Sequence, residues 1–331
     1  MKKFHVGCLL VGILLLALLI GQIGPRQLWQ ELALLGWGLI PLILIEGVAD
    51  LFRTQGWRYC LSGPHRSMPF FQIFRIRLAG GSINYLTPTA GLGGEVTKGT
   101  LLSLNHRGAE AASGVLIGKL ADSLALLIFV SLGSLTVLWK IHLSSVVWIA
   151  LLSGTLLLAA GILGFLIFQK YGKLGSILRW LVAHRVGGQV FEKAADHMNE
   201  VDRVLKSFYR ERPMDLPLAV FWHIMGMACG ILQSWYFFFL LTDDASLVMA
   251  AGVWFLGSWF DLLSFALPYN IGVLEATRVI AFRALGFEAA LGLTYGIMLR
   301  LEQIFWAGVG LLIYGTLLRG FKASRVQGSD A

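Results

Sequence analysis

Charged side chains occur inside several stretches of this sequence that are otherwise apolar. They are Glu95, Lys98, Lys119, Asp122, Asp261, Glu275, Arg278, Arg300 and Glu302. An ionised side chain at the centre of a bilayer costs about 2.5–3.5 kcal/mol on insertion scales, so such groups pair with one another or line a functional cavity. Lys119 and Asp122, like Glu275 and Arg278, are three residues apart and would share one face of a helix. Two interpretations stay open: these pairs bind a charged ligand, or they neutralise each other and only hold helices together.

Two of the carboxylates follow a break in the apolar sequence that contains proline and glycine. The blocks read Leu86-Thr-Pro88-Thr-Ala-Gly91-Leu-Gly-Gly94-Glu95 and Ala266-Leu-Pro268-Tyr-Asn270-Ile-Gly272-Val-Leu-Glu275. Such a break frees backbone N–H groups and creates helix N-termini, whose partial positive charge attracts a phosphate group. Lys98 and Arg278 follow the two blocks and would add a full positive charge. We expect the glutamates to position these cations or to titrate during transport.

Residues for most catalytic chemistries are absent. The sequence has no H-E-x-x-H motif, no paired histidines, no phosphatase-like set of lysine, arginine and histidine, and no ATP-binding P-loop. Its three cysteines show neither metal-ligand spacing nor a disulfide framework. We therefore expect no enzyme activity, no metal and no cofactor, and a gradient or downhill lipid flow as the source of driving energy.

The composition indicates a membrane protein. Hydrophobic residues make up 56% of the 331 residues and charged residues 14%, against about 25% charged in a soluble domain. The apolar runs are continuous rather than alternating, which excludes a transmembrane barrel. We predict an all-α polytopic integral membrane protein. Its net charge of +8 then reflects topology and contacts with anionic lipid, and no nucleic-acid partner is expected.

Apolar runs of about 20 residues, the length that crosses a bilayer, predict six full spans. They are Val6–Ile23, Leu32–Ala49, Ala111–Trp139, Ser144–Phe168, Leu216–Leu241 and Ala289–Leu318. Two further stretches, 70–102 and 247–285, are interrupted by proline, glycine and polar residues. They predict broken or re-entrant helix pairs, whose irregular backbone needs protein or a water-filled cavity around it. The sequence also allows that these stretches cross the membrane fully.

The two broken segments match each other along the sequence. Proline, glutamate, threonine and a basic residue recur with residue numbers that differ by 180: Pro88 and Pro268, Glu95 and Glu275, Thr97 and Thr277, Lys98 and Arg278. Three predicted spans separate the copies, and an odd number inverts the second copy. We therefore predict inverted-topology repeats at 32–139 and 216–318 within one transmembrane domain, 1–331. In secondary transporters with such repeats, the substrate site lies near the midplane, where discontinuous helices meet.

Most of the 27 lysines and arginines fall on one side of these predicted spans, which we expect to be cytoplasmic. This arrangement predicts a multi-pass protein of a bacterial inner membrane with both termini in the cytoplasm. Segment 169–215 has apolar residues at helical spacing and predicts an amphipathic interfacial helix, with a solvated connector as the alternative. We expect Glu46, Asp50 and Arg53 to form a snorkelling ion pair, and His223 to be a packed, hydrogen-bonded residue.

The block from Asn84 to Glu95, together with the second block and Leu299-Arg300-Leu301, resembles the flippase-like family that contains the transmembrane region of lysylphosphatidylglycerol synthases. That family also includes stand-alone proteins of isoprenoid, hopanoid or glycolipid pathways. The resemblance would cover nearly the whole chain and implies lipid translocation, with Pro88, Glu95, Pro268, Glu275 and Arg300 at the motif positions. The second block departs from the pattern, because Tyr269-Asn270-Ile271 stands where many relatives are richer in glycine. No aminoacyltransferase domain follows the last span, so aminoacyl transfer is not expected.

Together these features predict a transporter or flippase that moves an amphipathic lipid, anionic or isoprenoid-type, by alternating access at a charged midplane site. The predicted site residues are Asn84, Pro88, Gly94, Glu95, Lys98, Lys119, Asp122, Pro268, Asn270, Glu275, Arg278 and Arg300. Expected partners are membrane lipids with anionic headgroups, lipid-biosynthesis proteins and a second copy of the chain. Two alternatives stay open: a non-catalytic scaffold of a lipid-synthesis complex, and an embedded lipid-modifying enzyme.

Overall fold

The computed structural model of the protein describes residues 35–87, 92–104, 108–140, 145–171, 201–242, 245–264 and 273–327, with isolated positions before residue 35. Helices and turns form these ranges, and no strand occurs within them. The prediction of an all-α protein is therefore confirmed. The predicted span Val6–Ile23 and most of the predicted interfacial segment lie outside the described residues.

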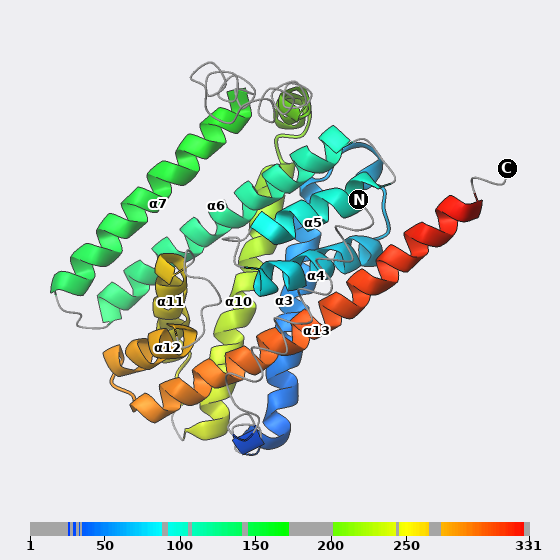
Figure 1. The fold of residues 1–331 in the computed structure, drawn as a ribbon. Helices are drawn as coiled ribbons and strands as arrows, with labels where there is room; N and C mark the ends of the chain where they lie inside the picture. Colours follow the sequence, from blue (N-terminus) through cyan, green and yellow to red (C-terminus); the bar gives the residue numbers. More distant parts are fainter. Residues whose placement is uncertain are drawn as a thin grey trace, which may run out of the picture.

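Residues 201–211, the described helical part of the predicted interfacial segment, join nine further α-helices in the described fold (Figure 1). They are α3 Leu39–Cys60, α4 Phe70–Leu86, α5 Leu92–Ser103, α6 Gly108–Lys140, α7 Ser145–Tyr171, α10 Asp215–Leu241, α11 Leu247–Ser264, α12 Val273–Ala284 and α13 Ala289–Gln327. Short 3-10 helices, η1 Gly36–Gly38 and η2 Gly63–His65, flank α3. Several bounds fall within a few residues of the predicted spans, because long apolar runs favour a single continuous helix.

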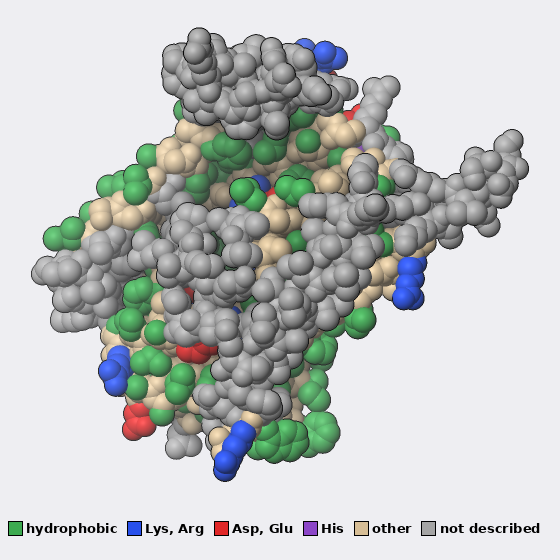
Figure 2. Space-filling model, in the orientation of Figure 1, with side chains coloured by type: hydrophobic (Ala, Val, Ile, Leu, Met, Phe, Trp, Pro, Cys, Tyr) green, Lys and Arg blue, Asp and Glu red, His purple; other side chains and the backbone are tan. Residues whose placement is uncertain are grey.

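Three of the described helices are long and apolar enough to cross a bilayer: Gly108–Gly133 in α6, Asp215–Leu241, which is α10, and Ala289–Arg319 in α13. Shorter apolar helices run over Leu152–Ile167 and Leu247–Asp261. Large apolar side chains stay exposed on the outside, including Leu157, which is 77% exposed, and the visible described surface is largely apolar (Figure 2). The chain is a multi-pass membrane protein, and the number of six full spans stays a prediction.

The helix α3 extends well past the predicted end of the second span at Ala49. It continues to Cys60, and the chain leaves it through extended Leu61 and through Gly63, whose φ of +55° is a left-handed conformation that suits glycine. Arg53, which lies beyond the predicted end of that span, is therefore helical. The helix tolerates its charged residues because they face the interior of the protein and pair there.

Both predicted broken segments are pairs of helices. The first helix of the first pair, α4, ends at Leu86, and Thr87 is extended with φ −109° and ψ 134°, as expected for a residue that precedes proline. The helices α5 and α12 begin inside the two proline-glycine blocks, at Leu92 and Val273, and each has the glutamate of its block, Glu95 or Glu275, in its first turn. An acidic side chain at this position interacts favourably with the N-terminal end of the helix dipole. The connections 88–91 and 265–272, with Pro88, Pro268 and Asn270, lie outside the described residues.

Most helix contacts in the first half of the chain have counterparts in the second half, but the contact of α3 with α6 has none of similar extent between α10 and α13. The helix α3 packs against α4, α4 against α5, and α5 against α6; in the same way α10 packs against α11, α11 against α12, and α12 against α13. Across the halves, α4 contacts α13 as α11 contacts α6, while α3 and α10 run along each other. Exchanging the two sets of four helices leaves this pattern unchanged. The predicted internal repeat would produce such a pattern.

The apolar core is divided into two large clusters. One contains Trp57, Ile76 and neighbouring side chains from α3, α4, α5 and α6, together with the later part of α13. The other contains Phe237 and Phe282 with side chains from the start of α3, from α10, α11 and α12, and from the start of α13. The long helices α3 and α13 therefore pass from one cluster to the other.

Candidate functional site

Charged residues occupy the zone between the two apolar clusters. On α3, Glu46, Asp50 and Arg53 lie between the buried residues of the second cluster, which end at Leu42, and those of the first, which begin at Trp57. On α13, Arg300 and Glu302 lie between Met298 and Ala307 in the same way. A layer of ionisable groups thus crosses the interior between two apolar regions.

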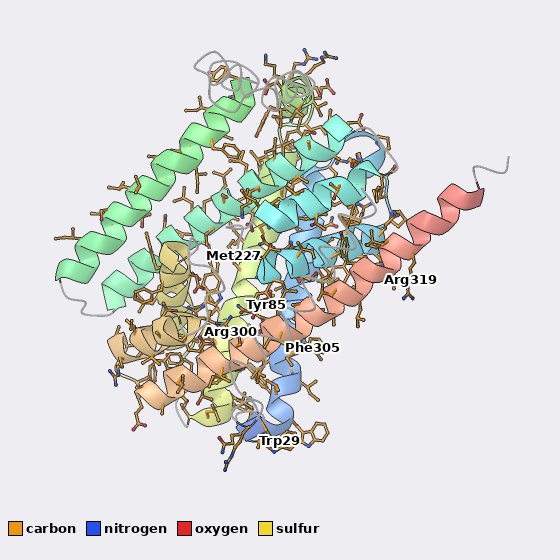
Figure 3. All side chains as sticks on the ribbon, viewed as in Figure 1. Trp29, Tyr85, Met227, Arg300, Phe305 and Arg319 are labelled. Carbon is orange, nitrogen blue, oxygen red and sulfur yellow. The ribbon has the colours of Figure 1, made fainter. Side chains whose placement is uncertain are left out.

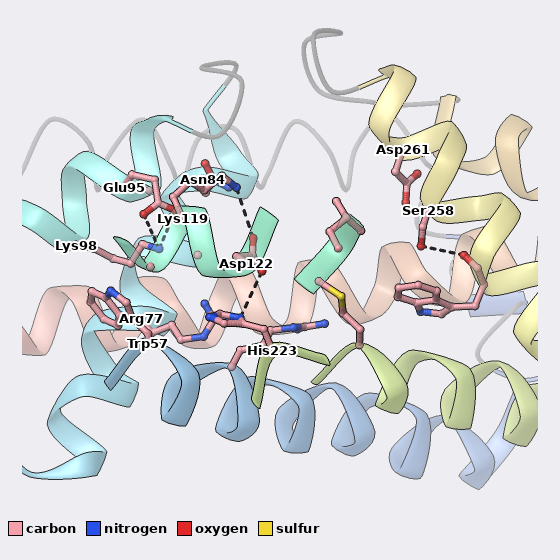
Figure 4. A pocket seen from close by; sticks show the side chains of 18 residues that line it. Trp57, Arg77, Asn84, Glu95, Lys98, Lys119, Asp122, His223, Ser258 and Asp261 are labelled. Carbon is pink, nitrogen blue, oxygen red and sulfur yellow. Dashed lines mark hydrogen bonds and ion pairs between the residues drawn. The ribbon is translucent and has the colours of Figure 1, made fainter. Parts of the chain in front are cut away.

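A cavity of about 520 Å³ opens in this layer (Figure 4). Six predicted site residues line it: Asn84, Gly94, Glu95, Lys98, Lys119 and Asp122. The prediction had left out five further polar lining residues: Arg53, Arg77, His223, Ser258 and Asp261. The volume falls within the range of about 300–1,000 Å³ that is typical of small-molecule sites. The cavity walls come from α3, α4, α5, α6, α10 and α11.

The helix α5 contributes an ion pair to the cavity wall. The ammonium of Lys98 lies 2.8 and 2.7 Å from the two carboxylate oxygens of Glu95. The same ammonium lies 5.3 Å from the ring centroid of Trp57, within the range of a cation–π interaction. Both charged side chains are mostly buried, with 13% and 19% of their surface exposed. Glu95 and Trp57 therefore hold Lys98 in one place at the cavity wall.

Two glycines allow α4 and α5 to approach closely behind this pair. A Cβ added to Gly94 would lie 2.6 Å from Cβ of Asn84 and would overlap the carbonyl oxygen of Gly80. A Cβ added to Gly80 would lie 2.9 Å from the carbonyl oxygen of Gly94 and would overlap the stem of Lys98. The positions of Asn84 and Lys98 at the cavity thus depend on backbone contact that larger residues would prevent.

Asp122 on α6 has two basic neighbours in the cavity. One carboxylate oxygen lies 3.6 Å from the ammonium of Lys119, and the other lies 3.4 Å from Nδ1 of His223 on α10. The expected proximity of Lys119 and Asp122 is confirmed. The expectation that His223 is hydrogen-bonded is wrong: among the described residues neither ring nitrogen has a hydrogen-bond partner, although the ring is buried.

The charged residues of α3 form a network with α4. Arg53 pairs with Glu46 and, at 3.3 Å, with Asp50, whose carboxylate also lies 2.9 Å from Arg77. The sequence predicted a snorkelling pair at the membrane surface, whereas Arg53 and Arg77 line the cavity. The spacing of residues 46, 50 and 53 on one helix face was the available signal. The participation of Arg77 depends on the packing of α4 against α3 and had no local signal.

The second broken segment forms ion pairs different from the predicted one. Arg278 binds Asp261 on α11, with nitrogen–oxygen distances of 2.6 and 3.1 Å, and donates to the carbonyl oxygen of Gly257 at 3.1 Å. Glu275 accepts two hydrogen bonds, at 2.9 and 3.2 Å, from Arg300 on α13. The predicted pair of Glu275 with Arg278 is wrong, because both side chains extend to neighbouring helices rather than along α12.

Arg300 is the most buried of these cations, with 1% of its surface exposed. It also donates a hydrogen bond of 3.3 Å to the hydroxyl of Tyr85 on α4, and Figure 3 shows the two side chains together at the centre of the protein. Glu275, Arg278 and Arg300 do not line the large cavity, but Asp261 does and connects Arg278 to it. Glu275, Arg278 and Arg300 thus stand behind the wall of the cavity.

A smaller cavity of about 190 Å³ lies next to the large one, and Arg77 and Gly81 line both. Glu302 lines the smaller cavity together with Glu46 and Tyr85, and its carboxylate accepts a hydrogen bond from Gln233. In the part of the chain that the structure describes, no group of three or more His, Cys, Asp or Glu residues is placed to hold a metal ion. Arg77, which pairs with Asp50, therefore lies between the two cavities.

Comparisons with known proteins agree with the helical membrane architecture. A family model described as the lysylphosphatidylglycerol synthase TM region matches residues 5–310. A protein of Pyrococcus horikoshii described as a UPF0104 membrane protein is 22% identical over 319 residues, which are 92% of this chain and 94% of that protein. No solved structure matches the chain. Because the family model covers nearly the whole sequence, the chain belongs to the family of the lysylphosphatidylglycerol synthase transmembrane region.

Proposed function

We propose that this protein is a transporter or flippase that moves an amphipathic lipid with an anionic headgroup through the charged cavity. The observation that carries the proposal is the cavity itself: four basic and three acidic side chains line about 520 Å³ of space in the interior of a membrane protein. A buried cavity that exposes so many ionised groups is costly in an apolar surrounding. Passage of a charged headgroup through the membrane is a function that requires it.

The ion pairs in the cavity allow an anionic ligand to replace a carboxylate as the partner of a lysine. The pair of Lys119 and Asp122 is loose at 3.6 Å, and the two side chains are 53% and 39% exposed. A phosphate group could replace Asp122 beside Lys119 and form shorter, charge-assisted hydrogen bonds. Lys98, by contrast, is held by Glu95 at 2.7 Å and would supply a fixed positive charge. Leu126 and Met227 in the cavity wall offer apolar contact to the chains of a lipid.

The repeated helix contacts support alternating access as the mechanism. Two related halves, each with a broken helix pair, can exchange conformations and so open one site to either face of the membrane. Family membership supports a role in lipid metabolism, because the family is named after the membrane region of lipid-modifying enzymes. The distribution of lysine and arginine further supports cytoplasmic termini in a bacterial inner membrane.

The experiment is lipid movement in proteoliposomes that contain the purified full chain. Fluorescent phospholipids, polyprenyl phosphates and hopanoid-type lipids are compared for the wild type, Glu95→Gln and Glu275→Gln. Glu211→Gln is the matched control, because Glu211 is 58% exposed and lies outside the cavity. Each variant is first shown to be folded by size-exclusion chromatography.

We expect one lipid class to move with the wild type and the control, and both cavity-related variants to lose this movement. If folded wild-type protein moves no lipid class, the transporter proposal is wrong. If cells that carry Glu95→Gln or Glu275→Gln also retain an intact lipid-synthesis complex, the result favours a scaffold function over transport. Chemical conversion of a lipid by the wild type would instead identify an enzyme.

A further inference from the structure

His223 is a buried titratable residue in the cavity wall whose polar atoms are unmatched. Only 4% of its surface is exposed. The ring packs against the backbone of α3, where a Cβ added to Gly56 would lie 2.8 Å from ring carbon Cδ2. Within the described ranges, neither ring nitrogen accepts or donates a hydrogen bond. Such unmatched buried groups are uncommon in native proteins and need a physical reason.

Protonation would improve the environment of this ring. A neutral imidazole has one donor and one acceptor nitrogen, whereas an imidazolium has two donors. Nδ1 lies 3.4 Å from a carboxylate oxygen of Asp122, so a protonated ring would face a carboxylate at ion-pair distance. The ring nitrogen that has no hydrogen-bond donor near it in the neutral form would then carry a proton. The carboxylate of Asp122 would be the partner of the buried positive charge.

The other charges around the ring make its protonation depend on the ligand. The charged side chains that line the cavity with His223 are Arg53 from α3, Arg77 from α4, Glu95 and Lys98 from α5, Lys119 and Asp122 from α6, and Asp261 from α11. The cations outnumber the carboxylates and oppose protonation of the ring. The negative charge of an anionic headgroup in the cavity would offset this excess, so proton and anion should each favour the binding of the other.

Asp122 connects the two binding events. In the structure it lies between Lys119 at 3.6 Å and His223 at 3.4 Å. An imidazolium at His223 would form an ion pair with the carboxylate of Asp122. The half-exposed ammonium of Lys119 would then be available to bind the headgroup. The proton adds to Nδ1 or Nε2 of the imidazole and is released again when the headgroup leaves.

We infer that His223 is the binding site of a proton that is transported together with an anionic lipid. This inference rests on the proposed function, because it names the coupling ion of the same cavity. It makes the proton gradient a source of driving energy for lipid movement. The imidazole of His223 binds the proton, and the carboxylate of Asp122, which also lies near Lys119, stabilises the resulting positive charge.

The first test measures lipid transport with and without a pH gradient. Fluorescent phosphatidylglycerol and a polyprenyl phosphate are the probes, in phosphatidylcholine vesicles that contain the full chain. In the wild type, acidification on the side where the lipid starts should raise the initial rate, by up to about tenfold per pH unit while the histidine titrates. His223→Gln should reduce this response to less than about twofold, since the amide does not titrate in this range. His65→Gln is the matched control, a buried histidine outside the cavity that should keep the full response.

The second test follows the proton on the ring and needs no transport. Nitrogen NMR of histidine-labelled full chain in detergent should show, among the histidine signals, one that is absent from His223→Gln and that gains a proton as the pH is lowered from about 8 to about 4. Inorganic phosphate should move this titration to higher pH in the wild type, and Asp122→Asn should weaken the effect. A ring at His223 that stays neutral over this range with and without phosphate would overturn the inference.

The outcomes separate this inference from the proposed function. Lipid movement that ignores the pH gradient, or that follows a sodium gradient, leaves the transporter intact and contradicts the role of His223. Gradient-dependent transport that survives in His223→Gln contradicts it as well. Absence of any lipid movement contradicts the proposed function, and the NMR titration then decides whether His223 binds a proton.

Discussion

The close contact of α4 and α5 gives a prediction whose size follows from the structure. In Gly94→Ala, the added methyl group would lie 2.6 Å from Cβ of Asn84 and would overlap the backbone carbonyl of Gly80. Neither neighbour is the far end of a flexible side chain, so the two helices must separate. The variant changes no charge in the cavity, but it moves the helix face that carries Asn84 and Lys98.

Overpacking of this kind typically costs about 1–3 kcal/mol. Alanine gains about 0.5–1 kcal/mol over glycine within a helix, which offsets part of that cost. We therefore expect a net loss of up to about 2.5 kcal/mol. At about 2 °C per kcal/mol for a long chain, the midpoint of thermal unfolding should fall by up to about 5 °C.

The matched control is Gly99→Ala on the same helix. A Cβ at Gly99 would meet only Cγ2 of Val115, at an ordinary contact distance of 3.8 Å. This variant should keep the helix-propensity gain and unfold at the wild-type temperature or slightly above it. Thermal unfolding in detergent at one fixed scan rate compares the two variants, and proteoliposome transport should fall in Gly94→Ala alone. Equal stability of the two variants would refute the claim that α4 and α5 are in backbone contact.

Two further predictions concern the charged residues. Glu275→Gln removes the carboxylate partner of Arg300, which is 1% exposed, and should lower the free energy of unfolding by about 3–5 kcal/mol. A double variant that also replaces Arg300 with methionine should lose less stability than the two single variants combined. Additive losses in thermal unfolding would show that the pair is not coupled. Lys119→Gln should weaken lipid transport without lowering the unfolding temperature, because the side chain is 53% exposed and its pair with Asp122 is long at 3.6 Å; unchanged transport would remove Lys119 from the site.

Much of the helical framework is predictable from local sequence. The structure places α10 at Asp215–Leu241, where the apolar run predicts a span over Leu216–Leu241. Long apolar runs favour one continuous helix, and the proline-glycine blocks predict where α5 and α12 begin. These features depend on nearest neighbours along the chain, which a sequence displays directly.

The pairing of charged side chains is not predictable in this way. Arg278 binds Asp261 on α11 rather than Glu275 on its own helix, since long side chains extend to whichever neighbour the packing supplies. In the same way, Arg77 pairs with Asp50 only because α4 packs against α3. The rotation of each helix about its axis decides these contacts. That rotation is set by the whole packed structure and has no local sequence signal.

Alternating access requires that one charged cavity opens in turn to both faces of the membrane. Ser258 on α11 lines the cavity and is partly buried, so Ser258→Cys places a small reactive group inside it. The natural cysteines Cys8, Cys60 and Cys229 are first replaced by serine, and the variant is shown to move lipid. A membrane-impermeant thiol reagent is then added to one face of sealed proteoliposomes at a time. With alternating access we expect the cysteine to react from either face, and the transported lipid to slow the reaction. Reaction from one face alone under every condition would exclude alternating access.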